Sequence, residues 1–414
     1  MKAFIKKLTP RWVLRMYHKS LNWLMAFRYG FPAKDLTVIL VTGTKGKSSV
    51  TEFLYHILTE GGHATTLING IHFILPNEEK RNMLKMTMPG RGQIHALLAQ
   101  ARAQGATHAV VEATSEGTLL DRHKLLFPNV FVFTNLHPEH IEAHGSFENY
   151  KEAKLSIGRE VLSSFKKEKA IIANADDAHG ADFIALSPDI AHAYSLDSAK
   201  NIQTRDTQVT FTYKDTPFTL KLPGVFNVSN ALAAITVAEF LQIPLKKAAA
   251  GLAKIDKVRG RLEFISAGQS FSVVVDYAHT PDSLKALYES FPQKEKICIL
   301  GNTGGGRDTW KRPEMARIAE SCCEKVILTN EDPYDEDPEK IVEDMSSAMQ
   351  QKPMVIMDRR KAMHAAFKEA QSNSIVLITG KGTDPYIMGP HGTKTPWDDA
   401  TVAREELVKI MNNS

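Results

Sequence analysis

The segment Thr37-Val38-Ile39-Leu40-Val41-Thr42-Gly43-Thr44-Lys45-Gly46-Lys47-Ser48-Ser49 decides the fold of this chain. Its β-branched and aliphatic run, Thr37–Val41, predicts a strand that is buried on both faces, as in a parallel sheet. The strand runs directly into a glycine-lysine-hydroxyl turn, and residues 48–60 read as a helix. A strand, turn and helix in this order are typical of a loop that binds the phosphates of a nucleoside triphosphate.

Each residue type in the turn has its own part in that chemistry. The glycines let the backbone N–H groups of the loop point at the phosphates, and Lys47 adds a mobile cation. Ser48 stands at the helix start, where its hydroxyl can hold Mg²⁺. Val41 occupies the place of the first glycine of the standard motif, so the loop is a shorter variant; the alternative is a plain glycine-rich turn. The expected nucleotide contacts in this segment are Gly43, Thr44, Gly46, Lys47, Ser48 and Ser49.

Length and composition bound the class of protein. With 414 residues, of which 43% are hydrophobic and 24% charged, the chain can form two or three globular domains. A formal net charge of +4, with no basic stripe among aromatic residues, argues against nucleic acid as a partner. Its three cysteines include the adjacent Cys322 and Cys323, which lack zinc-ligand spacing and fit a reducing cytoplasm. With no run near the ~20 apolar residues that span a bilayer, we expect a cytoplasmic monomer.

The N-terminal region predicts a helix over residues 9 to 29, with Thr9 as N-cap and Pro10 in the first turn. Its basic residues lie beside aromatic ones, which would suit an interfacial helix in peripheral contact with an anionic membrane. The alternative, which we favour, is a helix packed on the next domain, because apolar residues occur nearly all round it.

From residue 36 onward, apolar runs alternate with helical stretches, which predicts a parallel sheet covered on both faces. The segment 207–222 alternates apolar and polar residues and predicts an antiparallel hairpin. A second alternation begins near Val258 and is typical of a doubly wound α/β domain. Its strands are expected at 272–276, 297–300, 325–328, 354–357 and 375–379. The predicted organisation is a helix and linker (1–33), an ATP-binding domain (34–257) and a C-terminal domain (258–414).

Two predicted strands of the first domain end in chemically active residues. One ends at Glu112, a carboxylate placed to hold magnesium beside the phosphate loop. The other leads into TNLHPEHIEAHG (134–145) and the helix segment ENYKEAK (148–154). The three histidines of this stretch match no closed zinc site, so a metal role is expected for one or two of them at most.

These segments, together with GTKGKS (43–48), resemble the central domain of the Mur ligases, ATP-dependent enzymes that form amide bonds in cell-wall peptides. Further segments of the family pattern follow in order: NADD (174–177), LPGVFN (222–227), GRLE (260–263), DYAHTP (276–281), GGGRD (304–308) and GKGTD (380–384). Through DYAHTP and GKG, the chain most resembles the tripeptide synthetases of the family. The resemblance implies an α/β fold with a P-loop central domain and a Rossmann-like C-terminal domain.

The resemblance also assigns roles around the phosphate loop. It implies that Lys47 contacts the β- and γ-phosphates of ATP and that Ser48 and Glu112 bind a first Mg²⁺. A second Mg²⁺ would be bound by Glu112, His140 and the carbamate of a CO₂-modified Lys154. A carbamylated lysine is in effect a long carboxylate, which neutralises metal charge that an ammonium would repel.

Other implied contacts lie further along the chain. Asn227 resembles the family's adenine contact, Arg261 its phosphate contact and Asp276 its ribose contact. Asp384 would bind the ammonium of the incoming amino acid. The residues expected on the substrate side are Thr114, Ser115, Asp332, Tyr334, Gly380 and Asp384.

The amino acid that is added is expected to be lysine or ornithine. Family members that select diaminopimelate carry Asp-Asn-Pro-Arg, whose arginine grips the distal carboxylate. Here the aligned segment is EDPY (331–334), followed by more acidic residues. In the alternative, the acidic run is only a solvated loop and Lys381 serves the distal carboxylate.

The resemblance implies that a substrate carboxylate attacks ATP to give an acyl phosphate, which an incoming amine converts to an amide. About 40 residues precede the phosphate loop, so we expect a short form without the family's uridine-binding N-terminal domain. The acyl substrate is then a UDP-linked or lipid-linked muramoyl peptide, or another peptide. Two alternatives are a folylpolyglutamate-type ligase and a P-loop switch without ligase activity.

Overall fold

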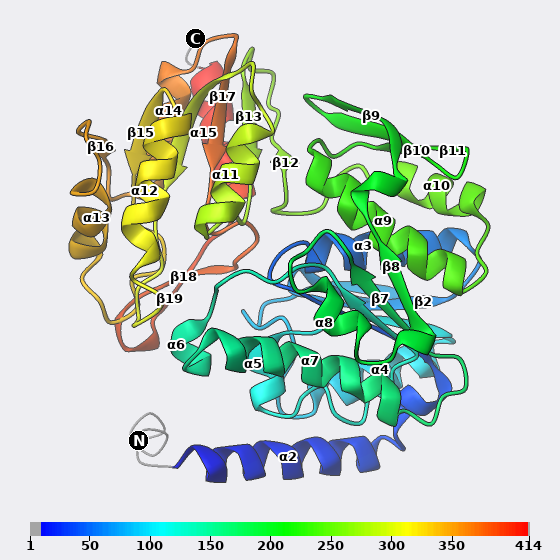
Figure 1. The fold of residues 1–414 in the computed structure, drawn as a ribbon. Coiled ribbons are helices and arrows are strands. Elements are labelled where there is room, and N and C mark those ends of the chain that lie inside the picture. The colour runs from blue at the N-terminus through cyan, green and yellow to red at the C-terminus, as the bar shows by residue number, and fades with distance from the viewer. Residues whose placement is uncertain (1–9, 413–414) are drawn as a thin grey trace. The chain divides into compact units, whose positions relative to one another are not determined.

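Strand β1 (Thr37–Thr42) lies inside an eight-stranded sheet of order β4-β3-β2-β5-β1-β6-β7-β8 (Figure 1). This computed structural model describes residues 10–412. Strand β1 pairs in parallel with β5 (His108–Glu112) and β6 (Val130–Phe133). The remaining strands of the sheet are β2 (Thr65–Ile68), β3 (His72–Leu75), β4 (Glu78–Arg81), β7 (Ala170–Asn174) and β8 (Ala191–Tyr194). At one edge, β3 runs antiparallel to both of its neighbours, β2 and β4, and the sequence pattern did not predict β3 or β4.

Helices cover both faces of this sheet. Alternate residues of β1, Val38 and Leu40, share one apolar core with side chains of α4 (Gln93–Ala103) and α7 (Phe147–Ser163). Helix α3 (Lys47–Glu60) contacts β1, β2 and β5 but has no side chain in that core, so it covers the opposite face. The other helices of this part of the chain are α5 (Ser115–Leu119), α6 (Ile141–His144), α8 (Gly180–Ile184), α9 (Val225–Phe240) and α10 (Leu245–Ala253).

The hairpin predicted over residues 207–222 is present as β10 (Gln208–Tyr213) and β11 (Thr216–Leu220). A further strand, β9 (Lys200–Arg205), joins them in a three-stranded sheet. Short 3₁₀ turns complete the chain: η1 (Pro32–Asp35), η2 (Pro188–Ile190), η3 (Leu196–Ser198) and η4 (Pro390–Gly392).

The chain divides into two compact units, with the main division between Ile255 and Asp256. The second unit also takes in two short stretches, Thr204–Val209 and Lys221–Phe226. Its six-stranded sheet has the order β12-β13-β17-β14-β15-β16, parallel except for β12 at one edge. The strands are β12 (Glu263–Phe264), β13 (Ser272–Val275), β14 (Glu295–Leu300), β15 (Lys325–Leu328), β16 (Met354–Val355) and β17 (Ser374–Ile378).

The sheet of the second unit is also covered on both faces. One apolar core packs it against α11 (Pro281–Glu289), α12 (Lys311–Cys322) and α13 (Pro338–Ser346). The other packs it against α14 (Arg359–Glu369) and α15 (Asp399–Asn412). A separate pair of strands consists of β18 (Tyr386–Met388) and β19 (Lys394–Pro396). The doubly wound α/β fold expected from the sequence is confirmed.

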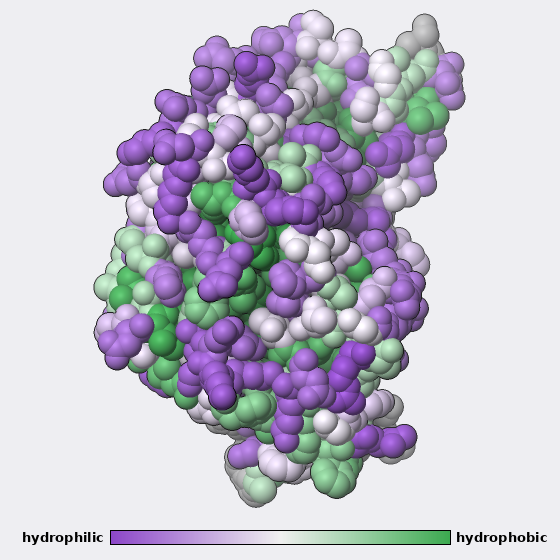
Figure 2. Space-filling view, turned by 90° about the vertical axis from the view of Figure 1, so that its right-hand side faces the viewer, coloured by the Kyte–Doolittle hydropathy of each residue, from purple (hydrophilic) through white to green (hydrophobic). Residues whose placement is uncertain are grey.

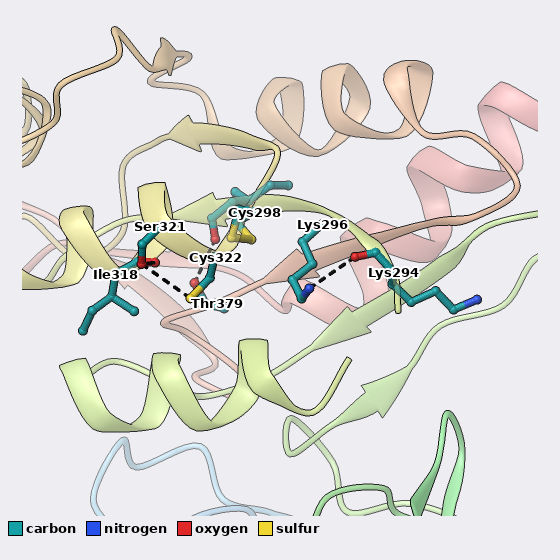
Figure 3. The surroundings of a disulfide bond; sticks show 9 residues. Lys294, Lys296, Cys298, Ile318, Ser321, Cys322 and Thr379 are labelled. Carbon is teal, nitrogen blue, oxygen red and sulfur yellow. Dashed lines mark hydrogen bonds between the residues drawn. A yellow bond between two sulfur atoms is a disulfide. The ribbon is translucent and has the colours of Figure 1, made fainter. Parts of the chain in front are cut away.

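The cysteines differ from the sequence expectation. Cys298 in the middle of the second sheet and Cys323 just after α12 form a disulfide, with their Cα atoms 6.1 Å apart (Figure 3). Cys322 is a free thiol, half-buried beside them. The two adjacent cysteines therefore differ in state: Cys323, just after the end of α12, is bonded to Cys298 of β14, whereas Cys322 is a free thiol.

The N-terminal helix, α2, extends from Arg11 to Arg28, close to the predicted range. The expected cap residue Thr9 lies outside the described residues, and Pro10 stands at the N-cap. Helix α2 packs near α4 in the first unit, as the favoured alternative expected. Within the part of the chain that the structure describes, no helix is long and apolar enough to cross a membrane.

Candidate active site

The phosphate loop follows the carboxyl end of β1, the position where ligands bind in open α/β sheets. Gly46 precedes α3 with φ +79°, a left-handed conformation that favours glycine. A Cβ atom at Gly46 would lie 2.3 Å from Asn230 Oδ1, and one at Gly43 would lie 1.9 Å from Thr134 Oγ1. Both glycines are therefore required by close packing, and the loop is fixed before any ligand arrives. Lys47 Nζ donates to the carbonyl oxygen of Thr44 at 2.8 Å.

The end of strand β6 holds the loop from one side. Asn135 Oδ1 accepts a hydrogen bond from Lys45 N at 2.8 Å, and Thr134 Oγ1 donates to the Lys45 carbonyl at 2.6 Å. On α7, the Tyr150 hydroxyl lies 3.0 Å from Thr44 Oγ1. Burial raises the pKa of this phenol, so Tyr150 remains neutral. These contacts keep the loop's backbone in one conformation, which is what preorganised phosphate binding needs.

The hydroxyl predicted to bind magnesium meets the predicted carboxylate. Ser48 Oγ donates to Glu112 Oε2 at 3.0 Å, and the same oxygen accepts from Gly70 N at 3.0 Å. Both side chains are buried. Oxygen ligands of this kind, one carboxylate and one hydroxyl, are the protein share of a Mg²⁺ site that also uses phosphate oxygens. The pair therefore fits a Mg²⁺ site beside the phosphate loop.

Lys154 is a buried lysine on α7, 2% exposed, whose Nζ donates to the Gly43 carbonyl at 2.7 Å. Burial lowers its pKa well below the ordinary value, the nearby Lys47 ammonium lowers it further, and Glu139 and Glu112 act in the opposite direction. A lowered pKa raises the fraction of neutral amine, which is the form that reacts with CO₂.

The loop after β6 brings Glu139 close enough to Lys154 to raise the pKa of that lysine, and His140 follows Glu139 in the same loop. Glu139 is buried, and its Oε1 lies 3.7 Å from His140 Nε2, while Glu116 Oε1 lies 3.7 Å from His140 Nδ1. His144 is buried, and burial lowers its pKa. Within residues 10–412, no three His, Cys, Asp or Glu side chains converge as a ready metal site.

Several residues at this site were not predicted. Glu139 adjoins His140 in the sequence, and Tyr150 lies in the ENYKEAK segment, so each stood within a recognised motif. Asn135 also stands in a recognised segment (134–145), although its contact with the loop comes from the tertiary fold. Asn230 lies outside every recognised segment, so no local pattern could have identified it.

Three further predicted residues lie in the same unit. Asn227 is buried on α9, and its Oδ1 accepts a hydrogen bond from Asn230 Nδ2 at 3.2 Å. Thr114 Oγ1 accepts from Gly117 N at 3.1 Å and so caps the short helix α5. Ser115 is buried at the start of that helix. Thr114 and Ser115 therefore also have a structural role at the start of α5.

In the second unit, the predicted nucleotide contacts surround the carboxyl end of β13. Asp276 accepts hydrogen bonds from Leu262 N at 2.8 Å and Ala278 N at 2.7 Å. Burial raises the pKa of Asp276, against the opposing effect of the Arg261 guanidinium. Arg261 stacks over the ring of Tyr277, with its guanidinium carbon 4.5 Å from the ring centre. The structure thus brings Arg261 and Asp276 together in this unit.

The predicted substrate residues of this unit form a buried ion pair. Lys381 Nζ lies 2.8 Å from Asp332 Oδ1 and 3.9 Å from Asp384 Oδ2, and it is fully buried. At Gly380, with φ +100°, a Cβ would lie 2.1 Å from Glu331 Oε2. From the sequence, Lys381 is only the alternative contact for a distal carboxylate, and its pairing with Asp332, 49 residues away, is not predicted.

The acidic run after Asp332 is mostly engaged with the protein itself. Glu336 forms a bidentate pair with Arg312 at 2.7 and 2.9 Å, and Asp337 caps α13. Asp335 is largely exposed and accepts a hydrogen bond from His391 N. Tyr334 has φ +54°, and its N–H donates to the Met388 carbonyl at 3.0 Å. The cationic attraction expected of the run is therefore weaker than its composition suggests.

Comparison with known proteins identifies the family. Residues 41–238 match the Mur ligase middle domain, and residues 260–382 match the Mur ligase, glutamate ligase domain. A "UDP-N-acetylmuramyl-tripeptide synthetase" of Roseiflexus sp. is 35% identical, over 94% of this chain and 81% of the relative. A "UDP-N-acetylmuramoyl-L-alanyl-D-glutamate--2,6-diaminopimelate ligase" of Bacillus cereus is 33% identical, over 95% of this chain and 83% of the relative. The chain belongs to the Mur ligase family.

Solved structures agree with this assignment. A structure of a UDP-N-acetylmuramoyl-L-alanyl-D-glutamate--2,6-diaminopimelate ligase has a TM-score of 0.61 and 27% identity, covering 92% of this chain and 79% of that one. A folylpolyglutamate synthase from Mycobacterium tuberculosis has a TM-score of 0.68 at 17% identity, covering 87% and 92%, which is a likeness of fold. Within the family the protein is MurE-like, an ATP- and Mg²⁺-dependent acid–amino-acid ligase.

Proposed function

We propose that this ligase joins an amino acid to a muramoyl-peptide precursor of peptidoglycan through an acyl phosphate. The observation that carries the proposal is the buried Lys154 beside the phosphate loop, together with the contact between Ser48 and Glu112. A simple nucleotide switch has no need of a buried lysine of lowered pKa at this position. The names of the relatives supply the substrate class.

In the proposed reaction, an oxygen of the substrate carboxylate attacks the γ-phosphorus of ATP, and ADP leaves. The incoming amine then attacks the acyl carbon, phosphate leaves, and the nitrogen loses a proton to give the amide. Bound Mg²⁺ neutralises phosphate charge and makes the γ-phosphorus a better electrophile. Lys47 adds a further positive charge, and the loop's N–H groups orient the phosphates. On the nucleotide, Asn227 serves the adenine, Arg261 a phosphate and Asp276 the ribose.

Lys154 is proposed to act as its carbamate, formed by attack of the neutral amine on CO₂ with loss of one proton. Its lowered pKa favours the reactive amine, and Glu112 and His140 are the proposed co-ligands. The carbamate adds the carboxylate oxygen that a second Mg²⁺ site lacks in the protein alone. Two Mg²⁺ sites, rather than one, follow from this proposal.

For the amino acid, lysine or ornithine is proposed over diaminopimelate. The aligned arginine position holds Tyr334, which carries no charge for a distal carboxylate. Because Asp332 is paired with Lys381 and Glu336 with Arg312, Asp335 is the proposed attraction for a cationic side chain. Asp384 is assigned to the α-ammonium, with Thr114, Ser115 and Gly380 near the rest of the substrate.

The remaining proposals concern organisation and surroundings. Residues 34–257 are proposed as the ATP-binding domain and 258–414 as the C-terminal domain, in a cytoplasmic monomer. The acyl substrate is UDP-linked or lipid-linked. Peripheral contact with a membrane is proposed separately, from the exposed apolar side chains of α2.

A coupled assay tests this function. The protein is incubated with ATP, Mg²⁺, a muramoyl dipeptide linked to UDP, and one amino acid at a time. We expect ADP release that requires both the peptide and the amino acid, with the tripeptide detected by mass spectrometry. ADP release without either substrate would contradict the ligase assignment and favour a switch. A folate substrate with glutamate serves as the second arm, because the fold is shared with folylpolyglutamate synthase.

A further inference from the structure

Helix α2 exposes an apolar face where a surface helix normally shows polar residues. Met16, Tyr17, Trp23, Leu24 and Phe27 are between 52% and 70% exposed. Positions 16, 20, 23, 24 and 27 recur at the spacing that places residues on one side of a helix, and only the serine at 20 is polar. Hydrophobic side chains also appear at the lower edge of Figure 2, where α2 lies. A face of this kind marks an interaction surface.

Contacts on the other side of the helix fix this orientation. Asn22 is buried, and its Nδ2 donates to the carbonyl oxygens of Asp121 at 3.2 Å and Lys124 at 3.3 Å. Its Oδ1 lies 3.1 Å from Nε2 of the buried His95. Ala26, one turn further, is fully buried. The helix thus turns its polar anchor toward the domain and its apolar face away from it.

The apolar surface continues from the helix onto the ATP-binding unit through a chain of rings. The ring of Trp23 lies 5.7 Å from that of Phe31, which lies 6.4 Å from Phe127. The ring of Phe127 lies 5.1 Å from that of Phe165, which is 59% exposed. We call these four rings and the exposed apolar residues of α2 the aromatic face. The aromatic face therefore includes residues outside α2 and is a surface of the folded first unit.

Lysines border the aromatic face. Lys34 Nζ lies 4.6 Å from the ring centre of Phe31, and Lys166 Nζ lies 5.4 Å from that of Phe165. The first 34 residues contain eight Lys or Arg and no Asp or Glu. Aromatic and aliphatic side chains rimmed by lysines are the composition of surfaces that lie in the headgroup region of anionic bilayers.

We propose that the aromatic face binds the surface of bilayers that contain anionic phospholipid. A second copy of the chain fits less well, because a two-fold contact would bring the lysines that border the face toward those of the other copy. No described helix can span the bilayer, so α2 lies in the plane of the interface. This inference does not rest on the ligase reaction, and the aromatic face contains no residue of the phosphate loop.

Sedimentation with vesicles tests the proposal. The full chain is mixed with vesicles of phosphatidylcholine alone, or of phosphatidylcholine and phosphatidylglycerol in equal amounts. We expect binding to the mixed vesicles and little to the neutral ones, and weaker binding at high salt because the lysine contribution is screened. Binding that is equal for both vesicles, or absent from both, would overturn the proposal.

Variants locate the surface. Leu24→Asp with Phe27→Asp is expected to lower vesicle binding at least about tenfold, because two inserted side chains are lost. The matched control is Val408→Asp with Met411→Asp, an exposed pair at the same spacing on α15, which should bind as the unchanged protein does. Lys19→Glu with Lys34→Glu should lower binding to the anionic vesicles.

Two further readouts separate the outcomes. Light scattering after size exclusion reports whether the α2 variants change the oligomeric state, and conversion of a dimer to a monomer would overturn the membrane proposal in favour of a second copy. ATP-dependent ligation of a water-soluble substrate should be unchanged in the Leu24/Phe27 variant. Unchanged vesicle binding by that variant, with its fold intact by circular dichroism, would also overturn it.

Discussion

Lys154 Nζ donates a hydrogen bond to the carbonyl oxygen of Gly43 at 2.7 Å, across 111 residues of sequence. The contact ties the middle of α7 to the first glycine of the phosphate loop. It places an amine of lowered pKa beside the loop on which the ligase depends. Lys154 is accordingly the residue whose chemistry most directly tests the proposed mechanism.

Replacing Lys154 with alanine should reduce ligation on the order of 10²-fold or more, because the proposed carbamate could no longer form and compensate charge at the proposed second Mg²⁺ site. Acetate should partly restore the rate, since a small carboxylate can occupy the vacated position. The matched control is Lys151→Ala on the same helix, whose ammonium pairs with Asp182 at 3.0 Å near the surface. Lys151→Ala should keep nearly normal turnover. A fully active Lys154→Ala enzyme would exclude the carbamate.

Lys47→Ala and Glu112→Ala should each abolish ligation while the fold is retained. Lys47→Ala removes a positive charge that would face the reacting phosphates, and Glu112→Ala removes the carboxylate proposed to hold Mg²⁺. Each loss should cost on the order of 10²-fold or more in rate. Chelation of Mg²⁺ should have the same effect on the unchanged enzyme, and addition of Mg²⁺ should reverse it. Turnover is measured as ADP release, and folding by thermal melting. Glu148→Ala, an exposed residue at the start of α7, is the control. Near-normal turnover of either active-site variant would move the active site elsewhere.

Amino-acid selectivity is expected to depend on Tyr334. Parallel assays with lysine, ornithine and diaminopimelate at equal concentration should show a preference for the first two. Tyr334→Arg should shift the preference toward diaminopimelate, because a guanidinium can pair with the distal carboxylate. Tyr334→Phe is the control and should leave the order unchanged. A clear preference of the unchanged enzyme for diaminopimelate would refute the prediction and favour Lys381 as the carboxylate contact.

Stability should fall as the pH drops below about 6.5, because of His95. Burial lowers the pKa of this histidine to about 4 in the folded chain. Between these values the unfolded chain takes up a proton that the folded chain does not, so the free energy of unfolding decreases, by about 3 kcal/mol in all. Urea denaturation at about pH 7 and about pH 4 measures the loss.

His95→Gln supplies the comparison for this pH effect. The variant cannot titrate, so its stability should fall less over the same interval, although it starts lower at neutral pH. His108, whose pKa burial also lowers to about 4, remains in both proteins and cancels in the difference. Equal losses in the two proteins would show that His95 is not the titrating group.

The sequence predicted those parts of the fold that have a strong local pattern. The run Thr37–Val41, the glycines after it and the alternating strands of the second unit were all found within a few residues. The edge strands β3 and β4 were missed because they are only four residues each, and β4 reads EEKR with no buried residue. Their pairing comes from the neighbouring strand rather than from their own composition.

The candidate site was predicted where motif and chemistry coincide, and missed where contacts are long-range. Ser48 and Glu112 were predicted together and lie 3.0 Å apart. The pairing of Asp332 with Lys381 was not predicted, because neither residue's neighbours indicate a partner 49 positions away. The Cys298–Cys323 disulfide was also not predicted, because its two cysteines are 25 residues apart and the sequence shows only Cys322 and Cys323 as neighbours.

That disulfide closes a covalent ring around the glycine-rich loop of the second unit. The bond joins residues 25 positions apart, and between them lie Gly305 and Gly306, both with positive φ, and the whole of α12. Glycines make the loop locally pliable, but the ends of the ring cannot separate when neighbouring hydrogen bonds open. The segment is therefore flexible at Gly305 and Gly306 and constrained near the two bonded cysteines. Amide hydrogen exchange should be rapid in the glycine-rich loop and slow in β14. Reduction of the disulfide should accelerate exchange in β14 and leave exchange in the loop unchanged.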